Sequence, residues 1–415
     1  MKTAYRDFMM VENQPYLYSI TYTSTDWNEA REWFKKHNSP RTDVKKEWKG
    51  RGFGCSSVRN GNLHGRNFDF FYNESADVIV HTEYDKSNAH YNSVGIASCN
   101  RDFNSHRMDE LTEEEFAILP FALIDGINEN GVACNVNVIP ARDLYSQDEK
   151  GEAAWSERVI DTNPGAPELY YQFMVRFVLD NATSAKNAVD LLKQQNIVNH
   201  IDGMRVDYDG IEDGGEELHL MISDIKETYI VEIMLDESGK DKLFVRSCTD
   251  GADKIPPIMT NYYVTKDGYN KYNTSHHAAG VERYTILKDH YLYANSVEEM
   301  RNLMQKVEFS DCYSLKQKLD ECWFSDISGG LFSYDKEDAM KYFDDQKKKS
   351  LLFEFKVKTL YLFFWQIRNS DDRSAWITVH TNVFDLEKKT MHLWVQEDYE
   401  HKIGEFTVKP KETSI

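Results

Sequence analysis

Three reactive side chains lie close together within residues 52–70, whose sequence is GFGCSSVRNGNLHGRNFDF. Cys55 supplies a thiol, Arg66 a guanidinium and Asp69 a carboxylate. The thiolate is the nucleophilic form of cysteine, and a nearby positive charge favours it. These residue types therefore indicate nucleophilic thiol chemistry at Cys55, on condition that the chain brings Arg66 beside the sulfur.

The dipeptide Asn60-Gly61 predicts a β-hairpin that makes this contact. A type I′ turn needs positive φ at both central residues, which Asn-Gly supplies. The resulting register places Cys55 directly opposite Arg66, with their Cβ atoms about 5 Å apart on one face. Asp69 then points to the other face, and it reaches Cys55 only if the strand bulges or ends early. A hairpin with a buried cysteine and a surface Arg–Asp pair fits the same residues, so spacing alone leaves both interpretations open.

The stretch GCSS…GNLHGRNFDF also resembles the start of the mature chain in the choloylglycine hydrolase and penicillin V acylase superfamily. That superfamily includes the isopenicillin N acyltransferase branch, whose members carry a pro-segment. They are N-terminal-nucleophile (Ntn) hydrolases, in which an N-terminal cysteine attacks the carbonyl of a linear amide. Further stretches resemble the family's motifs and follow in its order: GINENGVACNVNVIP (126–140), LHLMISD (218–224), PPIMTN (256–261), GVERY (280–284) and the closing hairpin WITVHTNVFDLEKKTMHLWVQEDY (376–399).

The resemblance implies a role for each matching residue. Cys55 takes the place of the nucleophile, and Arg66 and Asp69 match the family's GRNxD segment. The remaining site residues implied are an oxyanion-hole Asn, a second active-site Asn and a second Arg, which correspond to Asn137, Asn261 and Arg283. If the motif is aligned on Pro140, the match of Asn137 is off by one residue. Asn135, which lies on the same strand face, therefore stays as the alternative.

Enzymes of this family need a free α-amine on the nucleophilic cysteine. An α-amine has an ordinary pKa near 7.7–8.0 and can act as general base at neutral pH. Because Cys55 is internal, we expect self-cleavage at Gly54-Cys55 through attack of the thiol on the preceding carbonyl. Residues 1–54 would then be a removed pro-segment with a helix, and residues 55–415 the catalytic domain. A permanently attached N-terminal subdomain is the alternative, and it would leave the mechanism without its amine.

The resemblance implies a hydrolase of a linear non-peptide amide, such as an N-acyl amino acid, a conjugated bile acid or a penicillin. The acyl group would pass through a thioester on Cys55. An acyltransferase that delivers the acyl group to an amine forms the same intermediate and stays open, as does an uncleaved, non-catalytic small-molecule-binding protein on the same fold. No cofactor or metal is expected. Family members are often dimers or tetramers, so a homo-oligomer is expected by analogy.

Hydrophobic periodicity predicts an α+β protein. Helical spacing occurs at 27–37, where Asp26 is the expected N-cap, and at 167–181, 184–195 and 296–307. Short alternating or apolar runs between turn residues predict strands at 78–81, 93–98, 132–139, 218–223, 228–234, 242–247, 374–381 and 391–396. Strands and helices do not alternate regularly, which favours antiparallel sheets. The resemblance implies the four-layer αββα sandwich of Ntn hydrolases, with two stacked antiparallel sheets.

Composition excludes several other classes of protein. The formal net charge of −20 argues against a nucleic-acid footprint and against binding to anionic membranes. The first residues lack the apolar run of a secretory signal, so a cytoplasmic location is expected. The six cysteines show no CxxC pair. Apart from Cys55, most are expected to be buried reduced thiols.

Overall fold

The computed structural model describes the chain in separate stretches. They are residues 2–14, 17–37, 55–72, 77–98, 111–139, 160–198, 200–201, 204–205, 217–248, 256–265, 280–308, 375–395 and 401–411. Residues 38–54, which include the expected cleavage position at Gly54, lie outside the described part.

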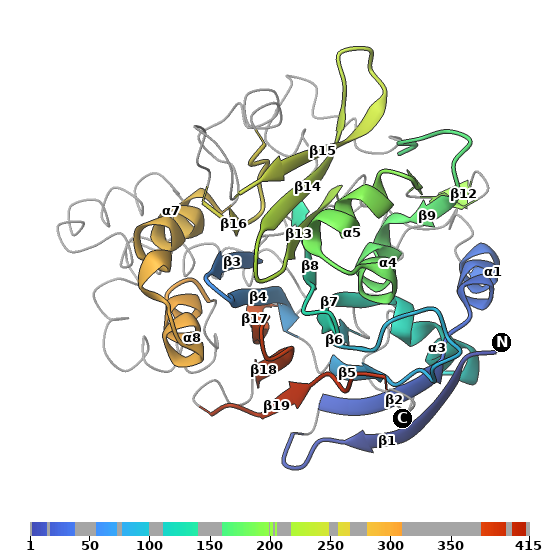
Figure 1. The fold of residues 1–415 in the computed structure, drawn as a ribbon, viewed down its shortest axis with the longest axis horizontal. Helices are drawn as coiled ribbons and strands as arrows, with labels where there is room; N and C mark the ends of the chain where they lie inside the picture. The colour runs from blue at the N-terminus through green and yellow to red at the C-terminus, as the bar shows by residue number, and fades with distance from the viewer. Residues whose placement is uncertain are drawn as a thin grey trace, which may run out of the picture.

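Two large sheets form the centre of the molecule (Figure 1). The nine-stranded sheet has the order β1 (Ala4–Met10), β2 (Leu17–Ser24), β5 (Asp77–Thr82), β6 (Ser93–Ser98), β7 (Leu123–Asn128), β8 (Ala133–Ile139), β13 (Glu217–Ser223), β14 (Thr228–Leu235), β15 (Asp241–Ser247). The six-stranded sheet has the order β16 (Ile258–Met259), β3 (Ser56–Asn60), β4 (Leu63–Tyr72), β17 (Ala375–Asp385), β18 (Thr390–Val395), β19 (Gly404–Thr407). All pairings in the two sheets are antiparallel except β2 with β5, which is parallel.

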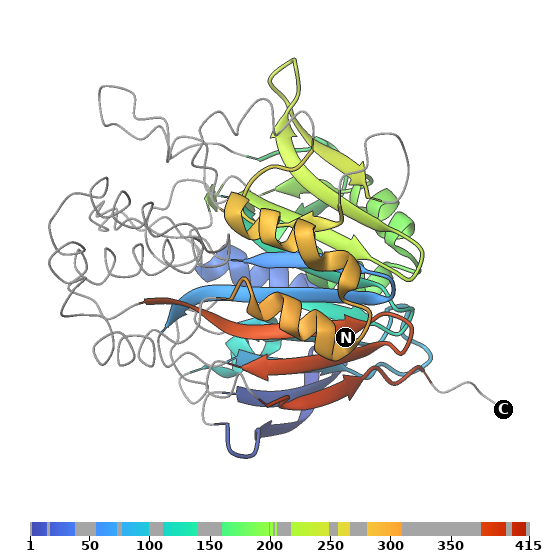
Figure 2. The same cartoon turned by 90° about the vertical axis from the view of Figure 1, so that its left-hand side faces the viewer.

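Helices cover the outer faces of both sheets, which confirms the αββα sandwich. Helices α4 (Met174–Asn181) and α5 (Ala185–Leu192) pack on the nine-stranded sheet, against β7, β8, β13 and β14. Helices α7 (Val281–His290) and α8 (Val297–Gln305) pack on the six-stranded sheet, against β16, β3, β4 and β17. Figure 2 shows this second pair in front of its sheet. The smaller elements are α1 (Trp27–His37), α3 (Glu113–Ile118), β9 (Glu168–Tyr170), β10 (Asn196–Val198), β11 (His200–Ile201) and β12 (Met204–Arg205).

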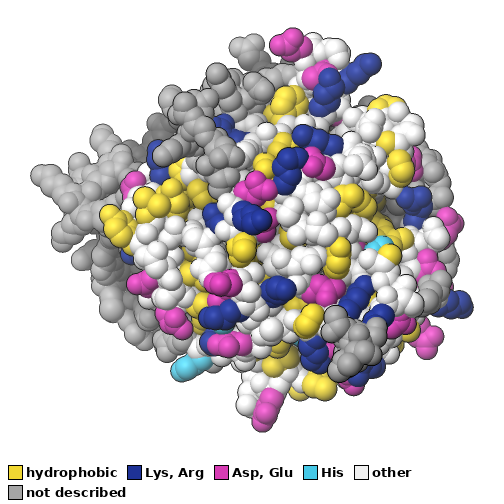
Figure 3. Space-filling view, viewed as in Figure 1, with side chains coloured by type: hydrophobic (Ala, Val, Ile, Leu, Met, Phe, Trp, Pro, Cys, Tyr) yellow, Lys and Arg dark blue, Asp and Glu magenta, His cyan; other side chains and the backbone are white. Residues whose placement is uncertain are grey.

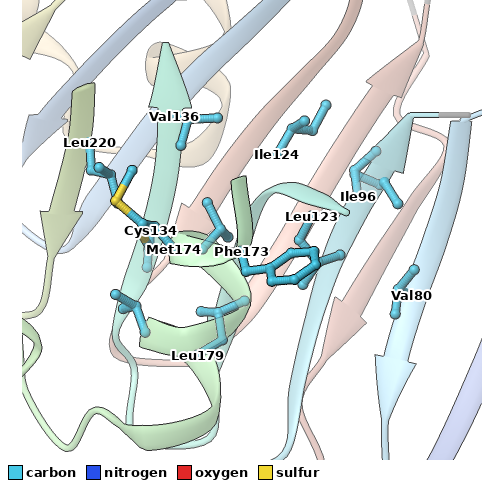
Figure 4. Packing of buried hydrophobic residues seen from close by; sticks show 14 of the residues in the cluster. Val80, Ile96, Leu123, Ile124, Cys134, Val136, Phe173, Met174, Leu179 and Leu220 are labelled. Carbon is cyan, nitrogen blue, oxygen red and sulfur yellow. The ribbon is translucent and has the colours of Figure 1, made fainter. Parts of the chain in front are cut away.

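Strand β8 shows how the sequence separates an apolar layer from a polar one. Side chains alternate between the two faces of a strand. Cys134 and Val136 join Met174 and Leu179 of α4 in the apolar core on the helix side of the sheet (Figure 4). Asn135 and Asn137 face the other sheet, where their amides bind Ser57. Around Asn135 and Asn137, the layer between the two sheets is therefore polar.

Most of the predicted elements are confirmed, including α1 at its predicted bounds. Asp26 caps α1, because its Oδ1 accepts from the backbone N–H of Asn28 at 2.9 Å. The helix predicted over 167–181 begins only at residue 174. Its first residues form β9, because Leu169 and its neighbours pair in parallel with β10. Tertiary pairing thus overrides helical spacing there.

The N-terminal segment is part of the nine-stranded sheet, which its sequence did not predict. Strand β2 pairs with β5, and Leu17, Ile20 and Tyr22 are fully or almost fully buried. The hydroxyl of Tyr22 donates to the carbonyl of Phe116 at 2.5 Å. The indole of Trp27 donates to Asp180 of α4 at 3.1 Å. Strand β2 and helix α1 therefore contribute to the hydrophobic core.

Charge is mixed on the face of the molecule seen in Figure 3, where Lys and Arg side chains lie among Asp and Glu side chains. In the described part of the chain, no helix is long and apolar enough to cross a membrane.

Candidate active site

The β3–β4 hairpin forms, but in a register that differs from the prediction. Asn60 lies opposite Leu63, and Ser57 lies opposite Arg66. The reason lies in the turn: Gly61, with φ of +58°, takes the first central position, which is where a type II′ turn requires glycine. The prediction that Cys55 lies directly opposite Arg66 is therefore wrong. Cys55 itself lies just before the paired residues, where the charges of both Arg66 and Asp69 act on its thiol.

Cys55 lies just before β3 and is buried, with 4% of its surface exposed. Its Sγ donates to the carbonyl oxygen of Asp69 at 3.7 Å. Burial raises the pKa of the Cys55 thiol, and the positive charges of Arg66 and Arg283 only partly oppose this effect. The thiol of the intact chain is therefore neutral, and it needs a base to become a nucleophile.

Asp69 lies on the opposite face of β4 from Arg66, as strand parity predicts. The strand itself is regular, and the bulge is in β17, where the register shifts between Thr378 and His380. This shift turns Thr378 toward Asp69, and its hydroxyl donates to Asp69 Oδ1 at 2.6 Å. The second oxygen, Asp69 Oδ2, is buried and has no hydrogen-bond partner among the described residues. Burial raises the pKa of Asp69 to about 7, against the lowering effects of Arg283 and Thr378.

Arg66 points into the polar layer between the sheets and is completely buried. Its Nη1 is 2.8 Å from Asp125 Oδ2 on β7, and its Nη2 donates to the carbonyl of Val136 at 3.2 Å. The guanidinium carbon also lies 4.8 Å from the ring centroid of Phe68. These contacts fix the position of Arg66, and Arg66 acts on the Cys55 thiol only through its positive charge.

Asn137 and Asn135 both lie in this polar layer. The Asn137 amide donates to the carbonyls of Met259 and Thr260 at 3.3 and 3.2 Å. Asn135 instead pairs with the His64 ring, 2.9 Å away, closer to the hairpin turn. Asn137 therefore lies beside the end of β16, and Asn135 lies closer to the hairpin turn.

Arg283 and Asn261 close the site from the helix side. Arg283 is in the first turn of α7, and its Nη1 donates to the carbonyl oxygen of Cys55 and, at 2.9 Å, to Ser56 Oγ. Its Nη2 donates to Asn261 Oδ1 at 2.6 Å. Asn261 follows β16 and donates to the carbonyl of Val138 at 2.7 Å. The structure thus gathers all six residues implied by the resemblance around the start of β3.

Sequence reasoning missed the polar residues that hold Arg66. Asp125 binds Arg66, and it also accepts hydrogen bonds from His380 and Asn382 of β17. The strand that carries Asp125 was not predicted. The available signal was a charged residue inside a run that is otherwise apolar: Asp125 in LIDGI and His380 in ITVHT.

Three solved structures are similar to this chain at low sequence identity. Two variants of conjugated bile acid hydrolase from Clostridium perfringens match with TM-scores of 0.38 and 0.36 and identities of 16% and 14%; both cover 87% of this chain, and the matches cover 97% and 98% of theirs. Penicillin V acylase from Agrobacterium tumefaciens matches with a TM-score of 0.30 and 15% identity over 82% of each chain.

No curated protein matches the sequence. The family model of linear amide C–N hydrolases, choloylglycine hydrolase family, matches residues 55–278, more than half of the chain, and the match starts at Cys55 itself. Because this match covers more than half of the chain, the chain belongs to the choloylglycine hydrolase family of linear amide C–N hydrolases.

Proposed function

We propose that this protein is a cysteine-nucleophile amidohydrolase that activates itself by cleavage at Gly54-Cys55. The observation that carries the proposal is the buried Asp69 Oδ2, which has no hydrogen-bond partner among the described residues and lies in the carboxylate next to Cys55. A new α-amine on Cys55 would supply the missing donor. The start of the family match at Cys55 supports the same boundary.

The cleavage is an acyl shift followed by hydrolysis. The Cys55 sulfur attacks the carbonyl carbon of residue 54, the C–N bond to Cys55 breaks, and the acyl group moves to sulfur as a thioester. The released nitrogen takes up the thiol proton and becomes the α-amine of Cys55. Water then hydrolyses the thioester, which frees the thiol and leaves a carboxylate on residue 54. In the intact chain, Asp69 is the candidate base, because its pKa of about 7 matches a neutral working pH.

In the cleaved enzyme, the α-amine takes over as general base. It accepts the thiol proton, the thiolate attacks the amide carbonyl of the substrate, and the amine returns a proton to the leaving nitrogen. Asp69 would orient the resulting ammonium and balance its charge. Water then hydrolyses the acyl-enzyme thioester and releases the acid.

Asn137 is the proposed side-chain donor to the oxyanion that forms during this attack. Its amide lies between Ser57 and the carbonyls that follow β16, at the end of the hairpin that carries Cys55. Loss of one such donor typically costs about 10²–10³ in rate. Arg283 and Asn261 would hold the backbone of Cys55 in place during the reaction.

The segment before the cleavage point would stay bound to the enzyme. Residues 17–22 of its strand β2 pair with β5 along all of β5, and Ile20 and Tyr22 are fully buried. Cleavage breaks one peptide bond and none of these contacts. The active form would therefore be a non-covalent complex of two pieces.

The substrate class we propose is a linear non-peptide amide, of the kind named for the bile acid hydrolase and penicillin acylase that the chain resembles. The test is a panel of N-acyl amino acids, conjugated bile acids and penicillins, with the released amine as readout. Cys55→Ala should abolish release for every substrate that the wild type cleaves. Cys134→Ala, which removes a thiol buried against α4, is the matched control and should keep activity. Equal activity in Cys55→Ala would refute the assignment.

A further inference from the structure

Four buried ionisable side chains form a continuous chain between the two sheets. His380 Nδ1 is 2.7 Å from Asp77 Oδ2 on β5, and His380 Nε2 is 3.0 Å from Asp125 Oδ2 on β7. Asp125 Oδ2 is also 2.8 Å from Arg66 Nη1. The side chains of His380, Asp125 and Arg66 are completely buried, and that of Asp77 is 6% exposed.

The two carboxylates beside His380 favour its imidazolium form. A neutral imidazole carries one N–H, whereas an imidazolium carries two. Both ring nitrogens here face a carboxylate oxygen, so a neutral ring would turn a lone pair toward one of them. An imidazolium satisfies both, and the chain of four groups is then neutral overall, with two positive and two negative charges.

The charged groups that face the ring are Asp77 on β5, Asp125 on β7 and Arg66 on β4. The two carboxylates favour the imidazolium, whereas Arg66 Nη1, 3.2 Å from His380 Nε2, opposes it. Burial by itself lowers the pKa of His380, but the charges of Asp125 and Asp77 outweigh this, and the pKa lies above its ordinary value.

Asp125 is the link between this histidine and the active site. Its Oδ1 accepts from Asn382 Nδ2 at 2.9 Å, and its Oδ2 accepts from both His380 and Arg66. These three donors hold the carboxylate of Asp125 in one orientation, and the carboxylate in turn orients the guanidinium of Arg66. Arg66 is in turn the group whose charge most strongly favours the thiolate of Cys55.

We propose that His380 and Asp125 are positioning residues for Arg66: the imidazolium of His380, held between Asp77 and Asp125, orients Asp125 and thereby fixes the positive charge that faces Cys55. This inference rests on the proposed function, which gives the charge at Cys55 its purpose.

The test is the rate of alkylation of Cys55 by iodoacetamide as a function of pH, followed by peptide mass spectrometry. His380→Gln removes one positive charge and one of the two hydrogen bonds. We expect the Cys55 profile to move to higher pH by about one unit, which is about tenfold slower alkylation at neutral pH. In an Arg66→Gln background, the His380→Gln change should shift the Cys55 profile much less, because the guanidinium that carries the effect to Cys55 is absent.

Asp180→Asn is the matched control, because it breaks the Arg176–Asp180 pair, a second fully buried Arg–Asp pair, on α4. It should lower thermal stability and leave the Cys55 profile in place. A His380→Gln profile that coincides with that of the wild type, or an equal shift without Arg66, would overturn the proposal.

A direct measurement on the wild-type chain keeps the proposal testable if the variants fail to fold. ¹⁵N NMR of the histidines should show both ring nitrogens of His380 protonated at pH 8, and a single N–H would contradict the charge assignment. Failure of the proposed function would show differently, as an uncleaved wild type without amide hydrolysis. The alkylation profiles are therefore compared between proteins in the same cleavage state, and the NMR spectrum reports on His380 alone.

Discussion

At the scale of single residues, the surroundings of Cys55 oppose ionisation of its thiol. Its thiol is buried with a raised pKa, and the carboxylate beside it, Asp69, also has a raised pKa because of burial. Both groups favour their neutral forms in the intact chain. A new ammonium group at Cys55 would change this balance, because a positive charge next to Asp69 favours the carboxylate.

Asp69→Asn, made in an uncleaved Cys55→Ala background, tests how much stability the chain loses by burying the Asp69 carboxylate. The folded pKa of about 7 lies above the ordinary value of 3.8, so the folded chain keeps a proton that the unfolded chain loses between these values. The contribution of Asp69 to the free energy of unfolding therefore falls as pH rises from about 4 to about 7 and then stays constant. Asn carries no such cost, and we expect the double variant to be more stable at pH 8 by on the order of 4 kcal/mol.

Urea unfolding of the two proteins between pH 4 and pH 8 measures this difference. The gap should be small at pH 4 and should widen toward pH 7. A gap that is independent of pH would show that Asp69 has an ordinary pKa.

At the scale of elements, α7 brings Arg283 to the backbone of Cys55. The helix follows Gly280, which has φ of +86°, and a Cβ at this position would lie 2.6 Å from Arg283 Nη2 and 2.8 Å from Thr260 Oγ1. Only glycine leaves room for the guanidinium to reach Cys55 and Asn261.

Gly280→Ala should therefore reduce amide hydrolysis by displacing Arg283, beyond the cost of about 1 kcal/mol for a left-handed alanine. Gly239→Ala is the matched control, since Gly239 has φ of +77° and no heavy atom within 4 Å of the added Cβ. It carries the strain without the clash and should keep wild-type kcat/KM. Steady-state kinetics and thermal unfolding of both variants separate the two effects, and equal kcat/KM for the pair would contradict the role of Arg283.

The N-terminal strands give a second prediction at this scale. If β2 holds its segment by pairing with β5, the cleaved protein should elute as one complex in size-exclusion chromatography and separate into two pieces only in denaturant. Trp27→Ala removes the hydrogen bond to Asp180 and should weaken retention. Loss of the segment from the wild type without denaturant would show that these contacts do not hold it.

The sequence predicted the positions of helices and strands better than it predicted which residues contact one another across them. Alternation in β8 and helical spacing in α1 and α8 are local signals, and these elements formed where expected. The predicted hairpin register was wrong because the register depends on which turn position Gly61 occupies. The observed pairing differs from the predicted one by two residues. The partners of Arg66 could not be found in the same way, because Asp125 and His380 lie far apart in sequence and meet only when the sheets stack.

At the scale of the whole molecule, the sandwich holds a group of buried charges between its two sheets. One hydrophobic cluster extends from α4 and α5 through the nine-stranded sheet to Phe384 and Leu393 of the six-stranded sheet, and another lies under α7 and α8. The layer between the sheets is free to hold Arg66, Asp125 and His380 in a dry setting where their charges act strongly. The start of β3, at the end of this layer, is where the reactive sulfur lies.

The most direct test of the central claim, that Cys55 becomes the first residue of the active enzyme, is the intact mass of the purified protein in denaturant, together with the N-terminal sequence of its larger piece. The wild type should give two pieces, of which the larger begins with the sequence CSSVRNGN, and Cys55→Ala should give a single chain of 415 residues. A wild-type chain that stays whole while it hydrolyses amides, or a Cys55→Ala chain that is still cut after residue 54, would contradict the claim.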